Sequence, residues 1–254
     1  MRCSKKVKLP ESITAIEDNA FSFCYSLKEI NIPNRVTAIG ESAFEKCEAL
    51  EKIDLLQCDK LKKIEKDTFW ACHALKEVKL PESITAIENL AFFDCRSLKE
   101  INIPNKVTSI GESAFKDCEA LEKIDLSQCD KLKKIEKDTF WACDALKEVK
   151  LPDSITVIED NAFYDCDSLK EINIPNKVTS IGESAFKNCE ALGEKTLSQY
   201  DNFLKKEARK KEEERRAREE SKRIEEKRKK KIIICIVIFW IIVLALMFIY
   251  ESTK

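Results

Sequence analysis

Residues 27–47 read Leu-Lys-Glu-Ile-Asn-Ile-Pro-Asn-Arg-Val-Thr-Ala-Ile-Gly-Glu-Ser-Ala-Phe-Glu-Lys-Cys, and variants of this stretch return along most of the chain. The part from Leu27 to Ile32 ends in an apolar-polar alternation, which predicts a short strand with one buried face. Pro33 then closes the strand, because proline lacks the N–H that a ladder needs. The preceding Ala-Phe-x-x-Cys, at residues 20–24, has room for one helical turn before the next strand.

The chain is an internal repeat, which the proline spacing reveals. Steps of 23 and 48 residues alternate between prolines, so the underlying block is 71 residues long. Residues 10–80 and 81–151 differ at only 11 positions, and a third copy follows from Pro152. Each block divides into rungs of 23, 25 and 23 residues, marked by Phe-x-x-Cys. The marker occurs at Phe21/Cys24, Phe44/Cys47, Phe69/Cys72, Phe92/Cys95, Phe115/Cys118, Phe140/Cys143, Phe163/Cys166 and Phe186/Cys189.

One rung alone cannot bury its own apolar positions, whereas stacked rungs can. The repeat therefore predicts an α/β solenoid of about eight rungs, right-handed, with a parallel β-sheet on one side and a continuous phenylalanine spine. Residues 192–204 keep the register of the block before them, and we predict that they form a decaying ninth rung that caps the array.

The repeat resembles a known family. Leu-x-x-Ile-x-Ile-Pro followed by the Val36–Cys47 pattern looks like the BspA-like subclass of leucine-rich repeats, seen in surface proteins of oral bacteria and parasitic protists. Residues 107–118 and 178–189 match the same pattern, and the likeness covers roughly residues 5–192. The resemblance implies a leucine-rich-repeat solenoid and non-catalytic adhesion or ligand binding, although a fold does not by itself define a function. The 25-residue rungs depart slightly, with Thr68 and Thr139 in place of alanine.

The solenoid is expected to occupy residues 1–203, and a charged helical stalk residues 204–231. Residues 205–231 hold 15 basic and 8 acidic side chains. A helix that is polar all round is a solvated spacer, and a coiled coil is the less favoured alternative. The favourable i,i+4 pairs are Glu207/Lys211, Glu212/Arg216, Glu214/Arg218, Glu219/Arg223 and Glu225/Lys229.

Residues 232–250 predict a transmembrane helix. The run from Ile232 to Tyr250 is uninterrupted by polar residues and is long enough to cross a bilayer core of about 30 Å. A buried core helix is the alternative, but no other part of the chain is expected to provide an apolar surface that could surround such a helix. Residues 251–254 form a short tail, and the protein is interpreted as single-pass and membrane-anchored.

The sequence leaves open which side of the membrane the repeats face. The basic cluster at residues 227–231 places the N-terminal bulk in the cytosol by the positive-inside rule. Residues 1–30 lack the apolar core of a signal peptide, and unpaired cysteines agree with a reducing compartment. The family resemblance instead implies the cell surface.

Catalysis and cofactors are not expected. The chain has one histidine and four glycines, which exclude a Cys2His2 zinc site and a Gly-rich phosphate loop. His73 has Asp144 as its counterpart one block later and no evident fixed partner, so it is interpreted as a surface residue. The cysteine column is interpreted as small buried side chains with a weak S–H donor, because metal sites favour closely spaced pairs.

The exposed strand positions form the first candidate surface for a protein partner. The signs of neighbouring charges mostly alternate, as cross-strand pairing favours, which gives a nearly neutral polar surface and argues against nucleic-acid binding. A solvated face without a partner is the alternative. The positions are Glu29, Asn31, Lys52, Asp54, Glu77, Lys79, Glu100, Asn102, Lys123, Asp125, Glu148, Lys150, Glu171 and Asn173.

Two aromatic pairs form the second candidate surface. The residue after each core phenylalanine is aromatic in adjacent rungs at Trp70 and Phe93, and again at Trp141 and Tyr164. They either fold down over the turns or form exposed patches for self-association or a partner.

We therefore predict a membrane-anchored recognition module for adhesion or ligand binding. The alternative is a tail-anchored scaffold that holds protein partners on the cytosolic side of an internal membrane.

Overall fold

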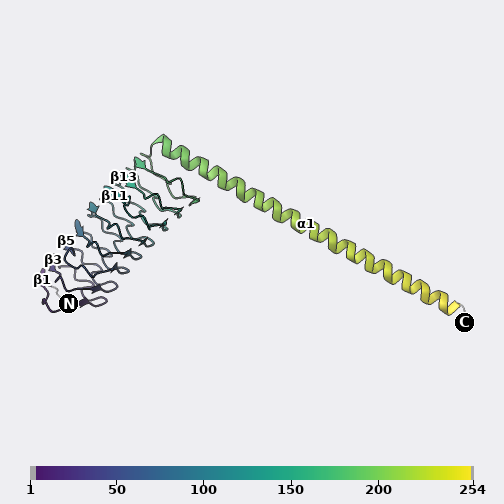
Figure 1. Ribbon diagram of the computed structural model, residues 1–254, viewed down its shortest axis with the longest axis horizontal. Coiled ribbons are helices and arrows are strands. Elements are labelled where there is room, and N and C mark those ends of the chain that lie inside the picture. The colour runs from purple at the N-terminus through teal and green to yellow at the C-terminus, as the bar shows by residue number, and fades with distance from the viewer. Residues whose placement is uncertain (1–3, 253–254) are drawn as a thin grey trace. The chain divides into compact units, whose positions relative to one another are not determined.

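The computed structural model describes residues 4–252, without the side chains of Lys195, Cys235 and residues 246–252. The chain divides into two compact units, Met1–Asp201 and Asn202–Lys254. The first unit is a solenoid of short strands, and the second consists of the later part of helix α1, Glu194–Ser252 (Figure 1).

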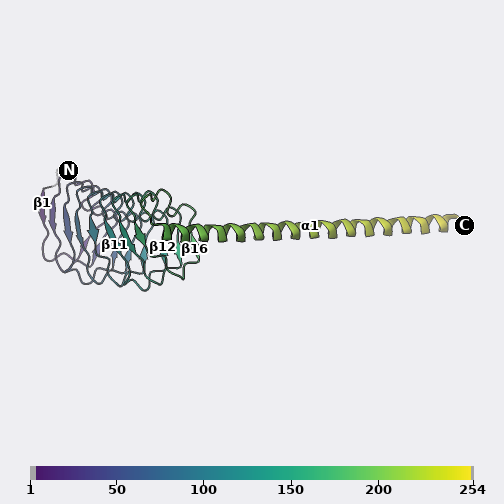
Figure 2. The same cartoon turned by 90° about the horizontal axis from the view of Figure 1, so that it is seen from above.

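The longer strands of the solenoid lie side by side in parallel, one from each rung (Figure 2). In each of them a single aliphatic side chain is turned inward, as the alternating pattern predicted; Ile53 and Ile124, for example, are 1% and 0% exposed. The pairing orders are β1-β3, β5-β7-β9 and β11-β13-β15, and β3 also contacts β5 as β9 contacts β11. These strands are β1 (Lys6–Lys8), β3 (Glu29–Asn31), β5 (Lys52–Asp54), β7 (Glu77–Lys79), β9 (Glu100–Ile101), β11 (Lys123–Asp125), β13 (Glu148–Lys150) and β15 (Glu171–Ile172).

A second row of parallel strands, which the sequence analysis did not separate from the first, is formed by the Val/Ile-Thr-x-Ile segments and, in the 25-residue rungs, by Leu-Lys-Lys-Ile. Each of these strands buries one isoleucine. From the second rung on, where a threonine precedes the strand, its N–H donates to the carbonyl oxygen of the threonine or lysine one rung back, as Thr37 N does to Thr14 O at 2.8 Å. They are β2 (Ala15–Ile16), β4 (Ala38–Ile39), β6 (Lys63–Ile64), β8 (Ala86–Ile87), β10 (Ser109–Ile110), β12 (Lys134–Ile135), β14 (Val157–Ile158) and β16 (Ser180–Ile181).

The helical turn predicted around Phe-x-x-Cys is wrong within the described residues. In the rungs of Phe21 to Phe163, the residues two before and two after the core phenylalanine take left-handed backbone angles, as Asn19 (φ 58°) and Phe23 (φ 59°) do. Their N–H groups donate to the next rung, with Phe23 N at 2.8 Å from Glu45 O. Each of these turns therefore combines hydrogen bonds to the next rung with single i→i−3 bonds, such as Cys24 N to Phe21 O at 3.1 Å, and does not form a helix.

Stacked phenylalanines form the centre of the core. The rings from Phe21 to Phe186 stack rung on rung, with centroids 5.3–5.5 Å apart and planes within 10° of parallel. Phe44 to Phe163 are fully buried, whereas Phe21 in the first described turn is half-buried. The predicted solenoid of about eight turns with a continuous phenylalanine spine is therefore confirmed.

The predicted ninth rung is wrong, because α1 begins at Glu194 in its place. The first turns of α1 nevertheless cap the solenoid. Tyr200 packs edge-on against Phe186 with ring centroids 5.2 Å apart, and its hydroxyl donates to the carbonyl oxygens of Gly182 and Glu183. The sequence analysis thus placed the cap at the right residues but gave it the wrong secondary structure.

Helix α1 contains both the predicted stalk and the predicted membrane span. Of the five predicted i,i+4 ion pairs, Glu212–Arg216 (2.8 Å) and Glu225–Lys229 (2.8 Å) are formed. Within the described residues, no helix is long and apolar enough to cross a membrane. Part of the predicted span, Cys235 and residues 246–250, lies outside the residues whose side chains are described.

Candidate functional site

The predicted strand-face residues lie on one side of the solenoid, on or beside its longer strands. All are exposed except Glu148 and Lys150, which are half-buried. Most register pairs of charged residues have opposite signs, such as Lys123 with Glu148, but Glu77 with Glu100 and Glu148 with Glu171 are like-charged. The solenoid thus brings all fourteen together on one surface.

Many charged side chains of this face form ion pairs with one another. Lys123 Nζ lies 3.2 Å from Glu148 Oε2, and Lys150 Nζ lies 3.3 Å from the other oxygen of the same carboxylate and 3.9 Å from Asp125. The two lysines hold the pKa of Glu148 below its usual value, Lys123 most strongly through a direct hydrogen bond. Pairs this exposed contribute little to stability, and a partner would have to displace them. The strand face also lacks the Trp, Tyr and Arg side chains typical of binding hot spots, and we rank it below the second candidate surface for that reason.

The second surface is a row that we call the aromatic ridge: Phe23, Lys46, Trp70, Phe93, Lys116, Trp141, Tyr164 and Lys187. Both predicted aromatic pairs are in contact, with ring centroids 6.1 Å apart for Trp70–Phe93 and 5.1 Å apart for Trp141–Tyr164. These four rings are half-buried. They neither fold completely under the turns nor stand free in solvent, so part of each ring remains exposed.

Lysines connect the aromatic pairs into a continuous row, a feature that the sequence analysis missed. Lys46 Nζ lies 4.9 Å from the centre of the Phe23 ring and 5.2 Å from that of Trp70. Lys116 Nζ lies 3.6 Å from the centre of Trp141 and 6.0 Å from that of Phe93. Such cation–π contacts are worth about 0.5–1 kcal/mol at exposed sites. The signal was in the sequence, because the column that holds the aromatic residues also holds Lys116 and Lys187.

The first turn adds two exposed rings that the sequence analysis did not select. Phe23 is 46% exposed and Tyr25 is 51% exposed, with ring centroids 6.1 Å apart. The second block has Asp94 and Arg96 at the corresponding positions. The ridge is therefore most apolar at its N-terminal end.

His73 has a partner, contrary to the prediction. Its Nε2 lies 2.9 Å from Asp94 Oδ2, and Arg96 Nε donates to the other oxygen of that carboxylate at 2.6 Å. The neighbouring thiols of Cys72 and Cys95 are buried, and burial raises their pKa well above the usual value. A reactive cysteine needs a lowered pKa and access to solvent, so these thiols do not make the His73 cluster a catalytic site.

The column cysteines act as hydrogen-bond donors between rungs. In the turns from Cys47 to Cys189, each Sγ lies 3.0–3.2 Å from the carbonyl oxygen of the core phenylalanine one rung back. Burial raises the pKa of Cys47 and of Cys189 to about 12. No group of His, Cys, Asp and Glu in the described part of the chain is arranged to hold a metal ion. One expectation is corrected: Cys24 is disulfide-bonded, whereas the cysteines were predicted to be unpaired.

Comparison with known proteins agrees with the repeat architecture. Residues 2–122 and 62–193 match the model of the BspA type leucine-rich repeat region, with six copies. A leucine-rich repeat protein from T. pallidum is 27% identical with a TM-score of 0.59, over 79% of this chain and 84% of that one. A leucine-rich cell surface protein from Faecalibacterium prausnitzii is also 27% identical, with a TM-score of 0.35, over 74% of this chain and 77% of that one. No curated protein matches the chain.

Proposed function

Since the chain belongs to the BspA-type leucine-rich repeat family, we propose that it is a non-catalytic protein-recognition module, held at a membrane, that serves in adhesion or ligand binding at the cell surface. The observation that carries the proposal is the aromatic ridge. Half-buried Trp and Tyr rings are the residue types that dominate binding energy at protein interfaces, and the lysines between them add a positive charge. We therefore assign the ridge to a protein partner with apolar and acidic side chains.

Membrane attachment is part of this proposal. The aliphatic and aromatic side chains from Ile232 to Leu244 that the structure describes are mostly exposed; Phe239 and Trp240, for example, are 61% and 58% exposed. An apolar surface of this extent needs a cover, and we propose that membrane lipid covers it.

The ridge is tested by a double charge substitution. In Trp70→Lys/Trp141→Lys the anchors are lost while the solenoid core is untouched, so affinity for a partner found among purified cell-surface and matrix proteins is expected to fall at least tenfold. Binding is measured by surface plasmon resonance on the full chain, and circular dichroism verifies the fold. The matched control is Lys79→Ala/Lys150→Ala, the same strand-face position in two blocks. Loss of binding in the control alone would assign recognition to the strand face instead.

The second candidate function is a tail-anchored scaffold with cytosolic repeats. It is favoured by the basic run Lys227–Lys231 directly before the apolar segment, because positive residues are retained on the cytosolic side. An epitope at the N terminus and protease added to intact cells separate the two candidates. Digestion from outside supports the surface module, and full protection supports the scaffold. Extraction at alkaline pH tests attachment itself, since a chain lacking residues 232–250 should then leave the membrane fraction.

A further inference from the structure

The strand sheet of the solenoid ends at β15 on an edge that no strand of the described residues completes. β15 pairs with β13 on one side. On the other side Gly193 N donates to Lys170 O at 3.3 Å, which repeats the bond from Lys170 N to Lys147 O one rung earlier (3.0 Å). Among the described residues, this is the one backbone bond to the outer edge of β15. The hydrogen-bond pattern of a ninth strand thus starts at Gly193 but does not continue beyond it.

The sequence explains why the ninth strand is missing. One block earlier, residues 122–126 read Glu-Lys-Ile-Asp-Leu and contain β11 (Lys123–Asp125), whose Ile124 is 0% exposed. At the corresponding residues 193–197 the chain reads Gly-Glu-Lys-Thr-Leu. Lysine replaces the one side chain that such a strand buries, so the burial that held each earlier strand in place is lost and α1 forms instead.

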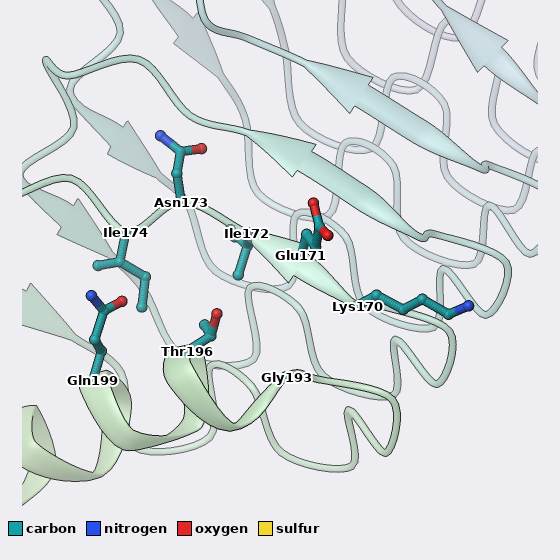
Figure 3. A pocket seen from close by; sticks show the side chains of 8 residues that line it. All are labelled: Lys170, Glu171, Ile172, Asn173, Ile174, Gly193, Thr196 and Gln199. Atoms are coloured by element: carbon teal, nitrogen blue, oxygen red, sulfur yellow. The ribbon is translucent and has the colours of Figure 1, made fainter.

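A groove lies where the strand would have been. A cavity of about 590 Å³ is bounded by Ile172, Asn173 and Ile174 along the edge strand and by Thr196 and Gln199 on the first turns of α1 (Figure 3). This volume is in the range of ligand sites. Its strand side offers the unpaired main chain of β15, which can bind an extended peptide as an added strand.

The earlier blocks show which side chains complement this edge. Glu171 is the third copy of Glu29 and Glu100, and the next rung in those blocks is β5 or β11, both Lys-Ile-Asp. In the rung after Glu29 or Glu100, the residue at the same position is therefore a lysine. In the rung after the asparagine that corresponds to Asn173, the residue at the same position is an aspartate. At β15 the neighbour of Glu171 on the inner side is a second carboxylate, Glu148. On the outer side, no strand residue of the described part of the chain lies beside Glu171. The charge of Glu171 thus favours a basic residue on the open side.

We propose that the β15 groove binds an extended segment of a partner protein as a parallel ninth strand, with the pattern Lys/Arg–Ile/Val–Asp–Leu. The basic residue lies beside Glu171, the branched residue packs inward next to Ile172, and the acidic residue lies beside Asn173. The inference deepens the proposed recognition function by naming a class of partner, but its site is separate from the aromatic ridge.

The test uses the full chain in detergent and a fluorescent peptide with the sequence of residues 120–128, Ala-Leu-Glu-Lys-Ile-Asp-Leu-Ser-Gln. Saturable binding by fluorescence polarisation is expected. A peptide with aspartate in place of its isoleucine should bind at least tenfold more weakly, because burial of that side chain is lost. Hydrogen exchange should slow at Ile172–Ile174 on binding of the first peptide.

Charge exchange provides the matched control. Glu171→Lys should lower the affinity for the first peptide about fivefold, as expected for the loss of a cross-strand charge pair. A peptide with glutamate in place of its lysine should bind the Glu171→Lys variant with the affinity restored. Trp70→Lys/Trp141→Lys should leave peptide binding unchanged, so failure of the ridge and failure of the groove are distinguishable. Equal affinity for the isoleucine and aspartate peptides would overturn the proposal. So would a dimer of the chain that buries the groove and is not dissociated by the peptide.

Discussion

At the residue scale, the cysteine of each turn shows how a position that suggests chemistry can serve packing. Cys47 Sγ lies 3.2 Å from Phe21 O, and the side chain is fully buried. The thiol joins one rung to the next and keeps its proton. The sequence analysis predicted a small buried residue with a weak donor, and the structure adds the acceptor, which the repeat pattern could not identify.

Alkaline pH should therefore destabilise the fold through these thiols. The pKa of Cys47 is raised to about 12 by burial, whereas an unfolded thiol titrates at about 8.5. Between these values the unfolded state has released the proton and the folded state has not, so stability is complete below pH 8.5 and falls as the pH rises toward 12. The slope is up to about 1.4 kcal/mol per pH unit for each thiol.

The measurement is urea unfolding at pH 8 and pH 10. Cys47→Ala should lose less stability over this interval than the unmodified chain. Leu50→Ala, a buried neighbour without a thiol, should keep the original pH dependence. If Cys47→Ala and the unmodified chain lost the same amount, the thiol proton would have no part in the effect.

At the scale of elements, the rung is stable only through its neighbours. The turns around the core phenylalanines combine left-handed residues with hydrogen bonds to the next rung. The two rows of strands also join each rung to the next through their parallel pairing. Neighbour interactions of this kind make the stability of a solenoid a sum over interfaces. A central rung has two interfaces, and the first has one.

The phenylalanine spine tests this difference. Phe115→Ala removes a fully buried ring stacked on both sides, and should lower the free energy of unfolding by about 3–5 kcal/mol. Phe21 is half-buried and is shown stacked on Phe44, so Phe21→Ala should cost clearly less. Chemical denaturation of both variants gives the comparison. Equal losses would mean that the first turn is packed as tightly as the centre.

At the scale of the whole molecule, the boundary between the two units is set by the cap. The sequence analysis ended the solenoid at residue 203, and the compact unit ends at Asp201. Leu192, Thr196 and Tyr200 are buried in that unit, so the first turns of α1 belong to the solenoid core. The rest of the helix is the second unit.

Two truncations locate the boundary by stability. A chain of residues 1–201 keeps the cap and should unfold cooperatively, with the urea midpoint of the full chain. A chain of residues 1–193 loses the Tyr200 ring and its bonds to Gly182 and Glu183. It should be less stable by at least about 2 kcal/mol, the approximate value of burying one large side chain. Equal midpoints for the two truncations would show that Tyr200 does not cap the solenoid.

The repeat, its period, the rung count and the buried column of phenylalanines followed from the sequence alone, because near-identical modules with the same apolar pattern can bury that pattern only against each other. The tertiary structure decided what depends on contacts between rungs. These are the left-handed turns, the acceptors of the thiols, the lysines placed over Trp70 and Trp141, and the helix at residue 194 where a ninth strand had been predicted. Such features are set by neighbours about 23 residues away in sequence, and a pattern read within one rung contains no information about them.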